Sequence, residues 1–279
     1  MAKNIIVIYH GGCHDGFGGA WAAYKKFGNK ADYLPAHHQE SMLNLRDKEI
    51  YFIDFIYNSP EIVKNLIKNN KKVTIIDHHP TAEQNVKLSE NYSFDLKHSG
   101  AVLAWKYFHH KKPVPKLLEY IEDCDLWKFK IANSKEISIS LQAVDFNFSA
   151  WNRIVKDFEF ASSRKKYIEQ GKLIWKHQFK LMYGLVNDSA YLVEFNGHKT
   201  FAINAPHYLA SDLGHLLYNK MPPMAIIWNQ KGDDIKVSLR SDGSVDVGKL
   251  AQKHGGGGHK AAAGFKISAN KKLPWEILR

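Results

Sequence analysis

Three short apolar runs each end in residues that commonly bind metal ions. They end in His10 with Cys13, His14 and Asp15, in Asp54, and in Asp77-His78-His79. A mixture of histidine and carboxylate suits Mn²⁺, Zn²⁺ or Fe²⁺ better than Ca²⁺. The ligands are too many for one ion, and two neighbouring ions are a standard arrangement for hydrolysing phosphate esters. These residues therefore indicate metal-assisted phosphoester chemistry.

Two further groups of residues extend this chemistry. The acidic stretch Glu122–Asp125 follows an apolar segment and could supply another metal ligand. The glycine run Gly255–Gly258 is followed by His259 and Lys260. Consecutive glycines let a backbone approach a phosphate closely, and Arg240 could add charge. We interpret the glycine run as an anion-binding loop.

The elements that must position these residues alternate between strand and helix patterns. Strands are predicted near 5–9, 50–55 and 73–76, and helices follow near 15–28, 59–67 and 99–108. Short loops between strands and helices are typical of a parallel sheet flanked by helices. Ligands bind at the carboxyl ends of such strands, so we expect the three clusters to converge.

The sequence pattern after residue 150 predicts a helical connector and then a smaller domain. We expect an α/β chain with an N-terminal parallel-sheet catalytic domain at 1–150, helices at 151–187 and a mixed α/β domain at 188–279. Strands are predicted at 199–204, 225–228, 235–239 and 263–267, with helices at 211–218 and 245–253.

Composition and charge narrow the function classes. The chain has 279 residues and a net charge of +11, and residues 151–279 carry most of that excess. A basic half attracts polyanions such as nucleic acid. No apolar run approaches a membrane span, no secretory signal is read, and two cysteines make no disulfide framework. We therefore expect a cytoplasmic protein without a membrane partner.

Together, Asp77-His78-His79, Ser238–Ser241 and Gly255–Phe265 resemble the DHH phosphoesterase superfamily. The likeness is to the branch with a DHH-associated C-terminal domain, which includes exonucleases, oligoribonucleases (nanoRNases), pAp phosphatases and cyclic dinucleotide phosphodiesterases. It extends from His10 to about residue 150 and from about 190 to the end. It implies a catalytic domain, a substrate-binding domain and two metal ions, commonly manganese.

The resemblance also implies roles for particular residues. The metal ligands would be His10, Asp15, Asp54, His78 and Asp123, with Asp54 shared between the ions and Asp125 as the rival of Asp123. Asp77 would support His78, and His79 would face the scissile phosphate. The substrate would be held by Arg240, Ser241, Gly256, Gly257, Gly258 and His259.

One position departs from the family pattern. The family's first motif has two aspartates before a glycine, but this chain has Cys13 where the first of them is expected. A thiolate from Cys13 or an imidazole from His14 could replace the missing carboxylate. The sequence leaves this choice open.

The resulting prediction is a hydrolase that cleaves short oligonucleotides or small nucleotide phosphodiesters with a water activated by both metals. The partner would be a short single-stranded nucleic acid or a nucleotide, and a homodimer is left open. A cyclic dinucleotide phosphodiesterase or a pAp phosphatase is the enzymatic alternative. A non-catalytic nucleotide-binding protein with a degraded metal site is the alternative of another class.

Overall fold

The first sheet is built from five parallel strands in the order β2-β1-β3-β4-β5. The computed structural model, which describes residues 3–37 and 43–278, confirms strands at β1 (Ile5–His10), β3 (Glu49–Ile53) and β4 (Lys72–Asp77). Their apolar residues are buried, as expected for central parallel strands. The edge strands β2 (Ala31–Ala36) and β5 (Asn91–Phe94) were not predicted, because both are only partly buried and carry polar residues or proline.

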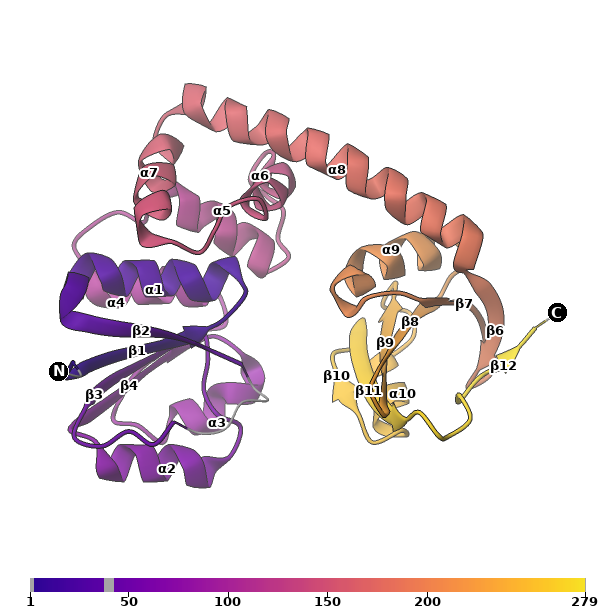
Figure 1. Cartoon of the computed structure of the whole chain (residues 1–279), viewed down its shortest axis with the longest axis horizontal. Coiled ribbons are helices and arrows are strands. Elements are labelled where there is room, and N and C mark those ends of the chain that lie inside the picture. Colours follow the sequence, from indigo (N-terminus) through magenta and orange to yellow (C-terminus); the bar gives the residue numbers. More distant parts are fainter. Residues whose placement is uncertain (1–2, 38–42, 279) are drawn as a thin grey trace. The chain divides into compact units, whose positions relative to one another are not determined.

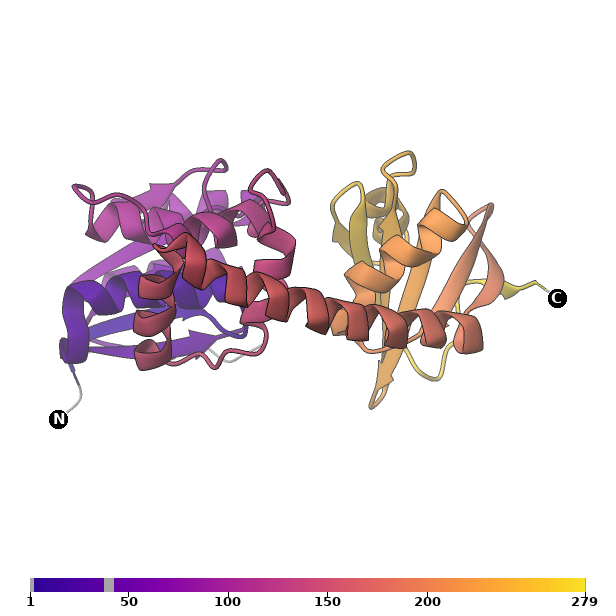
Figure 2. The same ribbon diagram turned by 90° about the horizontal axis from the view of Figure 1, so that it is seen from above.

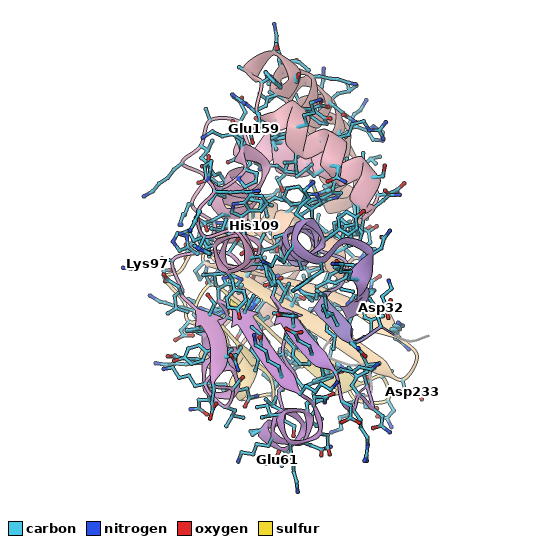
Figure 3. All side chains as sticks on the ribbon, turned by 90° about the vertical axis from the view of Figure 1, so that its left-hand side faces the viewer. Asp32, Glu61, Lys97, His109, Glu159 and Asp233 are labelled. Atoms are coloured by element: carbon cyan, nitrogen blue, oxygen red, sulfur yellow. The ribbon has the colours of Figure 1, made fainter. Side chains whose placement is uncertain are left out.

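Helices cover both faces of this sheet (Figure 1). α1 (His14–Phe27) and α4 (Gly100–Phe108) pack on one face, and α2 (Pro60–Asn69) and α3 (Glu83–Val86) on the other. In Figure 3, Glu61 of α2 and His109 after α4 mark these opposite faces. The α/β class expected from the alternating pattern is confirmed.

Three more helices extend the core over α1 and α4, namely α5 (Lys116–Asp125), α6 (Ser134–Leu141) and α7 (Phe148–Phe158). Trp151 of α7 is fully buried there. By contacts within the chain, the structure divides into units at 1–175 and 176–279, and α7 lies within the first unit.

The helix α8 (Ala161–Ser189) runs across the boundary between the units as one continuous element (Figure 2). It carries many lysines, and none of the described helices combines the length and apolarity that crossing a bilayer requires.

The second unit contains a mixed sheet of seven strands in the order β10-β11-β9-β8-β7-β6-β12. α9 (Ala210–Lys220) packs against β8 and β9, and α10 (Val247–Gln252) packs against β11. Among the described strands of this sheet, β7 and β8 pair in parallel and the others pair antiparallel. The strands are β6 (Tyr191–Phe195), β7 (His198–Asn204), β8 (Met224–Lys231), β9 (Asp234–Ser241), β10 (Gly257–Gly258), β11 (Ala262–Ser268) and β12 (Glu276–Ile277). The described residues also include short 3₁₀ helices at Gly28–Lys30, Pro80–Ala82 and His207–Leu209.

Two glycines on α8 provide a matched test of packing. A Cβ on Gly171 would overlap the backbone carbonyl of Glu136, whereas a Cβ on Gly184 would meet nothing within 4 Å. Alanine favours a helix over glycine by about 1 kcal/mol. We expect Gly184→Ala to raise the thermal unfolding midpoint and Gly171→Ala to lower it, with an overpacking cost of ~1–3 kcal/mol. Equal increases in both variants would contradict this packing of α8 on α6.

Candidate functional site

The carboxyl ends of three adjacent strands bring the candidate metal ligands together. The chain leaves β1 toward β2 on one side and leaves β3 toward β4 on the other, and such a reversal commonly opens a crevice at the carboxyl edge of a sheet. His10 ends β1, Asp54 follows β3, and Asp77 ends β4. The predicted convergence of the three clusters is therefore seen in the structure.

Asp54 occupies the centre of the cluster. Its side chain is 3 % exposed, its N–H donates to the carbonyl of Ile76, and its φ of 56° lies in the left-handed region that few non-glycine residues adopt. Its two carboxylate oxygens face different groups of side chains. This arrangement suits a carboxylate shared between two ions.

The first group surrounds Asp54 Oδ2. His10 Nδ1 lies 3.5 Å from that oxygen, Cys13 Sγ also lies 3.5 Å from it, and the sulfur is 3.3 Å from His10 Nδ1. Ligands of one tetrahedral zinc-like ion lie about 3.4–3.6 Å apart, given the usual bond lengths. Cys13, whose role the sequence leaves open, therefore lies where a third metal ligand could be.

The second group surrounds His78 Nε2. This nitrogen lies 3.3 Å from Asp54 Oδ1, 3.4 Å from Asp125 Oδ2 and 3.8 Å from Asp15 Oδ2. Three carboxylates and one imidazole therefore meet at one point.

Two buried polar atoms at the centre of the cluster indicate that it fits a metal. Among the described residues, Asp54 Oδ1 and His78 Nε2 lie 3.3 Å apart, but neither atom makes a hydrogen bond of good geometry. Buried polar groups are normally paired, because leaving one unpaired is costly. A cation would satisfy both atoms, and the surrounding imidazole and carboxylate donors are suitable ligands.

The charges in the cluster perturb one another. Burial, together with the negative charges of Asp54 and Asp125, raises the pKa of Asp15 well above its usual value. Burial disfavours the charged form of His78, but contact with Asp54 and the charges of Asp15 and Asp125 outweigh it and raise the pKa of His78 to about 9. Perturbed groups of both signs at one sheet edge are characteristic of functional sites.

Asp15 is fixed by the N-terminus of α4. Its carboxylate accepts hydrogen bonds from the N–H groups of Gly100, at 2.7 Å, and Ala101, at 3.0 Å. A Cβ on Gly100 would lie only 2.6 Å from the Cβ of Asp54. Gly100 is therefore needed for the helix to approach the cluster, a role that its place in a helix-start pattern did not reveal.

Asp77 holds His79 rather than joining either ligand group. One oxygen of the buried Asp77 accepts from the N–H groups of His78 and His79 and lies 2.8 Å from His79 Nδ1. The hydrogen bond to Asp77 raises the pKa of His79, although burial opposes it. The His79 side chain is 45 % exposed, so its other nitrogen can reach a ligand.

The structure does not bring Asp123 to the cluster, and Asp125 lies there instead. The buried carboxylate of Asp123 accepts hydrogen bonds from the N–H groups of Lys130 and Ile131, at 2.9 and 3.0 Å. Residues two apart on a helix point about 200° away from each other. Only one of the pair can face His78, and we therefore replace Asp123 by Asp125 in the candidate ligand set.

A cavity of about 360 Å³ adjoins the cluster. Cys13, His14 and Asp125 line its polar side, and Ile121 and Leu141 line its apolar side. This cavity offers space for part of a substrate next to the candidate metal ligands.

The predicted substrate residues of the second unit gather around β9. Arg240 donates to the hydroxyl of Ser211 and to the carbonyl of Leu239. His207 Nδ1 lies 3.0 Å from the hydroxyl of Ser238 on the same strand as Arg240. His207 and Ser211 therefore lie beside the predicted substrate residues, although no sequence motif identified them. The hydroxyl of Ser241 donates to backbone carbonyls, which indicates that it holds the following loop.

The glycine run forms part of a tight sheet edge. Gly257 and Gly258 pair with β11, and a Cβ on Gly256 or Gly258 would overlap that strand. The N–H groups of Gly256 and His259 donate to Ala251 and Ala262. These two donors are thus used internally, whereas the His259 side chain is exposed.

Comparisons with known proteins are consistent with this site. A model of the DHHA1 domain matches residues 208–274. An uncharacterized protein, R106, of Acanthamoeba polyphaga mimivirus is 30 % identical over 97 % of this chain and 69 % of its own length. The family match supports a hydrolase acting on phosphoester bonds. The chain belongs to the DHH phosphoesterase superfamily.

Solved structures share the fold at low sequence identity. A pGpG-specific phosphodiesterase, PggH, from Vibrio cholerae is 15 % identical, with a TM-score of 0.55 and coverage of 96 % of this chain and 94 % of that one. RecJ from Thermus thermophilus in complex with Mn²⁺ is 13 % identical, with a TM-score of 0.53 and coverage of 95 % and 50 %. An exonuclease RecJ bound to manganese is 16 % identical, with a TM-score of 0.51 and coverage of 95 % and 86 %.

The placement of Cys13 leads to a spectroscopic prediction. If its sulfur binds an ion with His10 and Asp54, Co²⁺ added to the metal-free protein should give a sulfur-to-cobalt charge-transfer absorption band in the near ultraviolet. Cys13→Ser should lose that band, and Cys13→Asp should bind Mn²⁺ in preference to Zn²⁺, because carboxylate is the harder ligand. Cys124→Ser is the matched control and should keep the band. An identical spectrum in Cys13→Ser would remove Cys13 from the ligand set.

Proposed function

We propose that the chain is a metal-dependent phosphodiesterase that hydrolyses short oligonucleotides or small nucleotide phosphodiesters. The observation that supports this most directly is the placement of Asp54. One of its oxygens lies among His10 and Cys13, and the other lies beside His78. A shared carboxylate between two groups of ligands suits two divalent ions that act together on one phosphate.

The proposed ligands divide between two positions. His10, Cys13 and Asp54 would hold one ion, and Asp54, His78, Asp15 and Asp125 would hold the other. Manganese suits the second position, where three of the four donors are carboxylates, and the two RecJ structures with the same fold contain this ion. Which ion fills the first position depends on Cys13.

The reacting phosphate would lie beside this cluster, with its charge stabilised by protein groups. His79 donates through Nδ1 to Asp77, which leaves Nε2 to face a phosphoryl oxygen. Its raised pKa favours the protonated ring, and a fixed positive group near developing negative charge lowers the barrier. Divalent ions at the two positions would supply the charge that activates water and neutralises the phosphoryl oxygens.

The second unit would provide a nucleotide-binding surface of its own. Arg240 on β9 donates to Ser211 on α9, the His259 side chain is exposed, and His207 lies beside Ser238 in the same unit. Guanidinium groups bind phosphate oxygens well because their N–H groups match the geometry of the anion. The glycine run would contribute mainly by allowing close strand packing.

Fold neighbours support a nucleotide phosphodiester as the substrate. PggH is described as a pGpG-specific phosphodiesterase, and RecJ as an exonuclease. Product-resolved digestion of labelled short RNA and DNA ladders tests the proposal, with pAp and cyclic dinucleotides assayed alongside. Turnover of pAp or cyclic dinucleotides alone would favour the alternative activities.

Removal of Asp54 tests the metal assignment. We expect Asp54→Ala to abolish hydrolysis and to lose most of the bound metal, because the shared ligand serves both positions. Metal per chain is measured by mass spectrometry after purification, and circular dichroism verifies the fold. Asp233→Ala, which removes an exposed carboxylate of the second unit (Figure 3), should change neither quantity. Near-normal metal content and turnover in Asp54→Ala would show that the site is misassigned.

Substitutions in the second unit should affect substrate binding. We expect Arg240→Ala and His259→Ala to raise KM for a dinucleotide more than they lower kcat, because uniform binding energy is lost from both ground and transition state. Lys271→Ala removes an exposed charge of the same unit and serves as the control. An unchanged KM in both variants would contradict this role for β9 and the glycine run.

A further inference from the structure

We propose that Trp127 and Phe129 form a stacking surface for one nucleobase of the substrate, next to the candidate metal ligands. This inference rests on the proposed function and assigns it a base-binding element. The two rings lie on the loop that follows α5 and are among the large apolar side chains exposed in the described structure.

The two aromatic side chains are unusually accessible. Trp127 is 72 % exposed and Phe129 is 40 % exposed. Their ring centroids lie 4.9 Å apart at an interplanar angle of 77°, an edge-to-face arrangement. Because one ring meets the other through its edge, a broad ring face stays available for a planar ligand.

The loop holds both residues in an unfavourable backbone conformation. Trp127 has a φ of 55° and Phe129 a φ of 47°, in the left-handed region that bulky residues rarely adopt. Such conformations persist where the surrounding structure enforces them, and they cluster at ligand sites.

Asp123 is the residue that enforces this loop conformation. Its carboxylate binds the N–H groups of Lys130 and Ile131, and its carbonyl accepts from the N–H groups of Lys128 and Phe129. The ammonium group of Lys128 also donates to the carbonyl of Lys97. A loop held in this way loses little freedom on binding, so contact with a ligand is not offset by ordering. Asp123 is therefore a positioning residue.

The location of the loop and the charges on it indicate the chemical class of the ligand. Trp127 lies two residues after Asp125, so its Cα lies within about 7 Å of the Cα of that candidate ligand. Lys128 and Lys130 are exposed on the same loop. Aromatic faces interspersed with cations are the usual means of binding single-stranded bases and their phosphates.

A nucleobase fits this loop better than a protein partner. A stable protein interface buries about 800 Å² on each side. Two rings flanked by lysines on one loop provide only a small apolar area, which matches one base.

The test compares a dinucleotide with two analogues that each lack one base. Stacking contributes ~1–3 kcal/mol per base, so Trp127→Ala should raise KM about 5- to 150-fold on the complete dinucleotide with little change in kcat. On the analogue that lacks the base stacked on Trp127, the same substitution should have no effect. Trp127→Phe should keep most of the affinity. Phe160→Ala removes a 58 % exposed ring elsewhere in the first unit and should leave KM unchanged.

Binding of a dinucleotide with a non-hydrolysable phosphonate linkage, measured by calorimetry, separates this inference from the proposed function. If wild-type protein hydrolyses no phosphodiester but Trp127→Ala still weakens binding, the proposed function fails and the stacking surface stands. Unchanged binding in Trp127→Ala overturns the stacking surface. An equal loss on both base-lacking analogues, or a changed oligomeric state in Trp127→Ala, also overturns it.

Asp123→Asn tests the positioning role. We expect the same base-dependent rise in KM with unchanged metal per chain, whereas Asp125→Asn should lose bound metal. Loss of metal in Asp123→Asn with an unaltered preference for the complete dinucleotide would overturn the positioning role.

Discussion

The first unit depends on keeping several carboxylates together at one edge of a parallel sheet against their mutual repulsion. Asp15, Asp54 and Asp125 all approach His78, and two of the three are buried. Like charges at this distance are tolerated only when positive groups or donors oppose them. The N-terminus of α4 provides N–H groups for Asp15, and His78, whose pKa is raised, provides a cationic partner for Asp54. Bound divalent cations would supply most of the remaining compensation.

That requirement accounts for features elsewhere in the unit. Gly100 has no side chain, which lets α4 reach Asp15. Asp77 turns away from the shared centre and binds the backbone of the two following histidines, so it adds no further charge between the candidate ligands. The left-handed conformation of Asp54 presents one oxygen to each group of donors. A site of this kind depends on the backbone as much as on the ligands themselves.

The second unit differs from the first, because no buried carboxylate lies among its described residues and Arg240 supplies a positive charge. Arg240 and His259 belong to a mixed sheet whose glycines allow β10 to lie close against β11. Several N–H groups of the glycine run are used within the unit, so phosphate contacts would come mainly from side chains. In the proposed function, the basic composition of this half would serve substrate binding, and the acidic residues of the first half would hold metal.

Sequence alone determined the α/β fold class and the meeting of His10, Asp54 and His78, because apolar runs define parallel strands and ligands gather at the carboxyl ends of such strands. It could not decide between Asp123 and Asp125, since that choice depends on the rotation of α5 about its axis. Nor could it tell that Cys13 lies within 3.5 Å of two other donors or that Trp127 is exposed. The approach of Cys13 to Asp54 joins segments distant in sequence, and the exposure of Trp127 depends on how the loop after α5 is held by Asp123. Local sequence patterns reveal neither of these contacts.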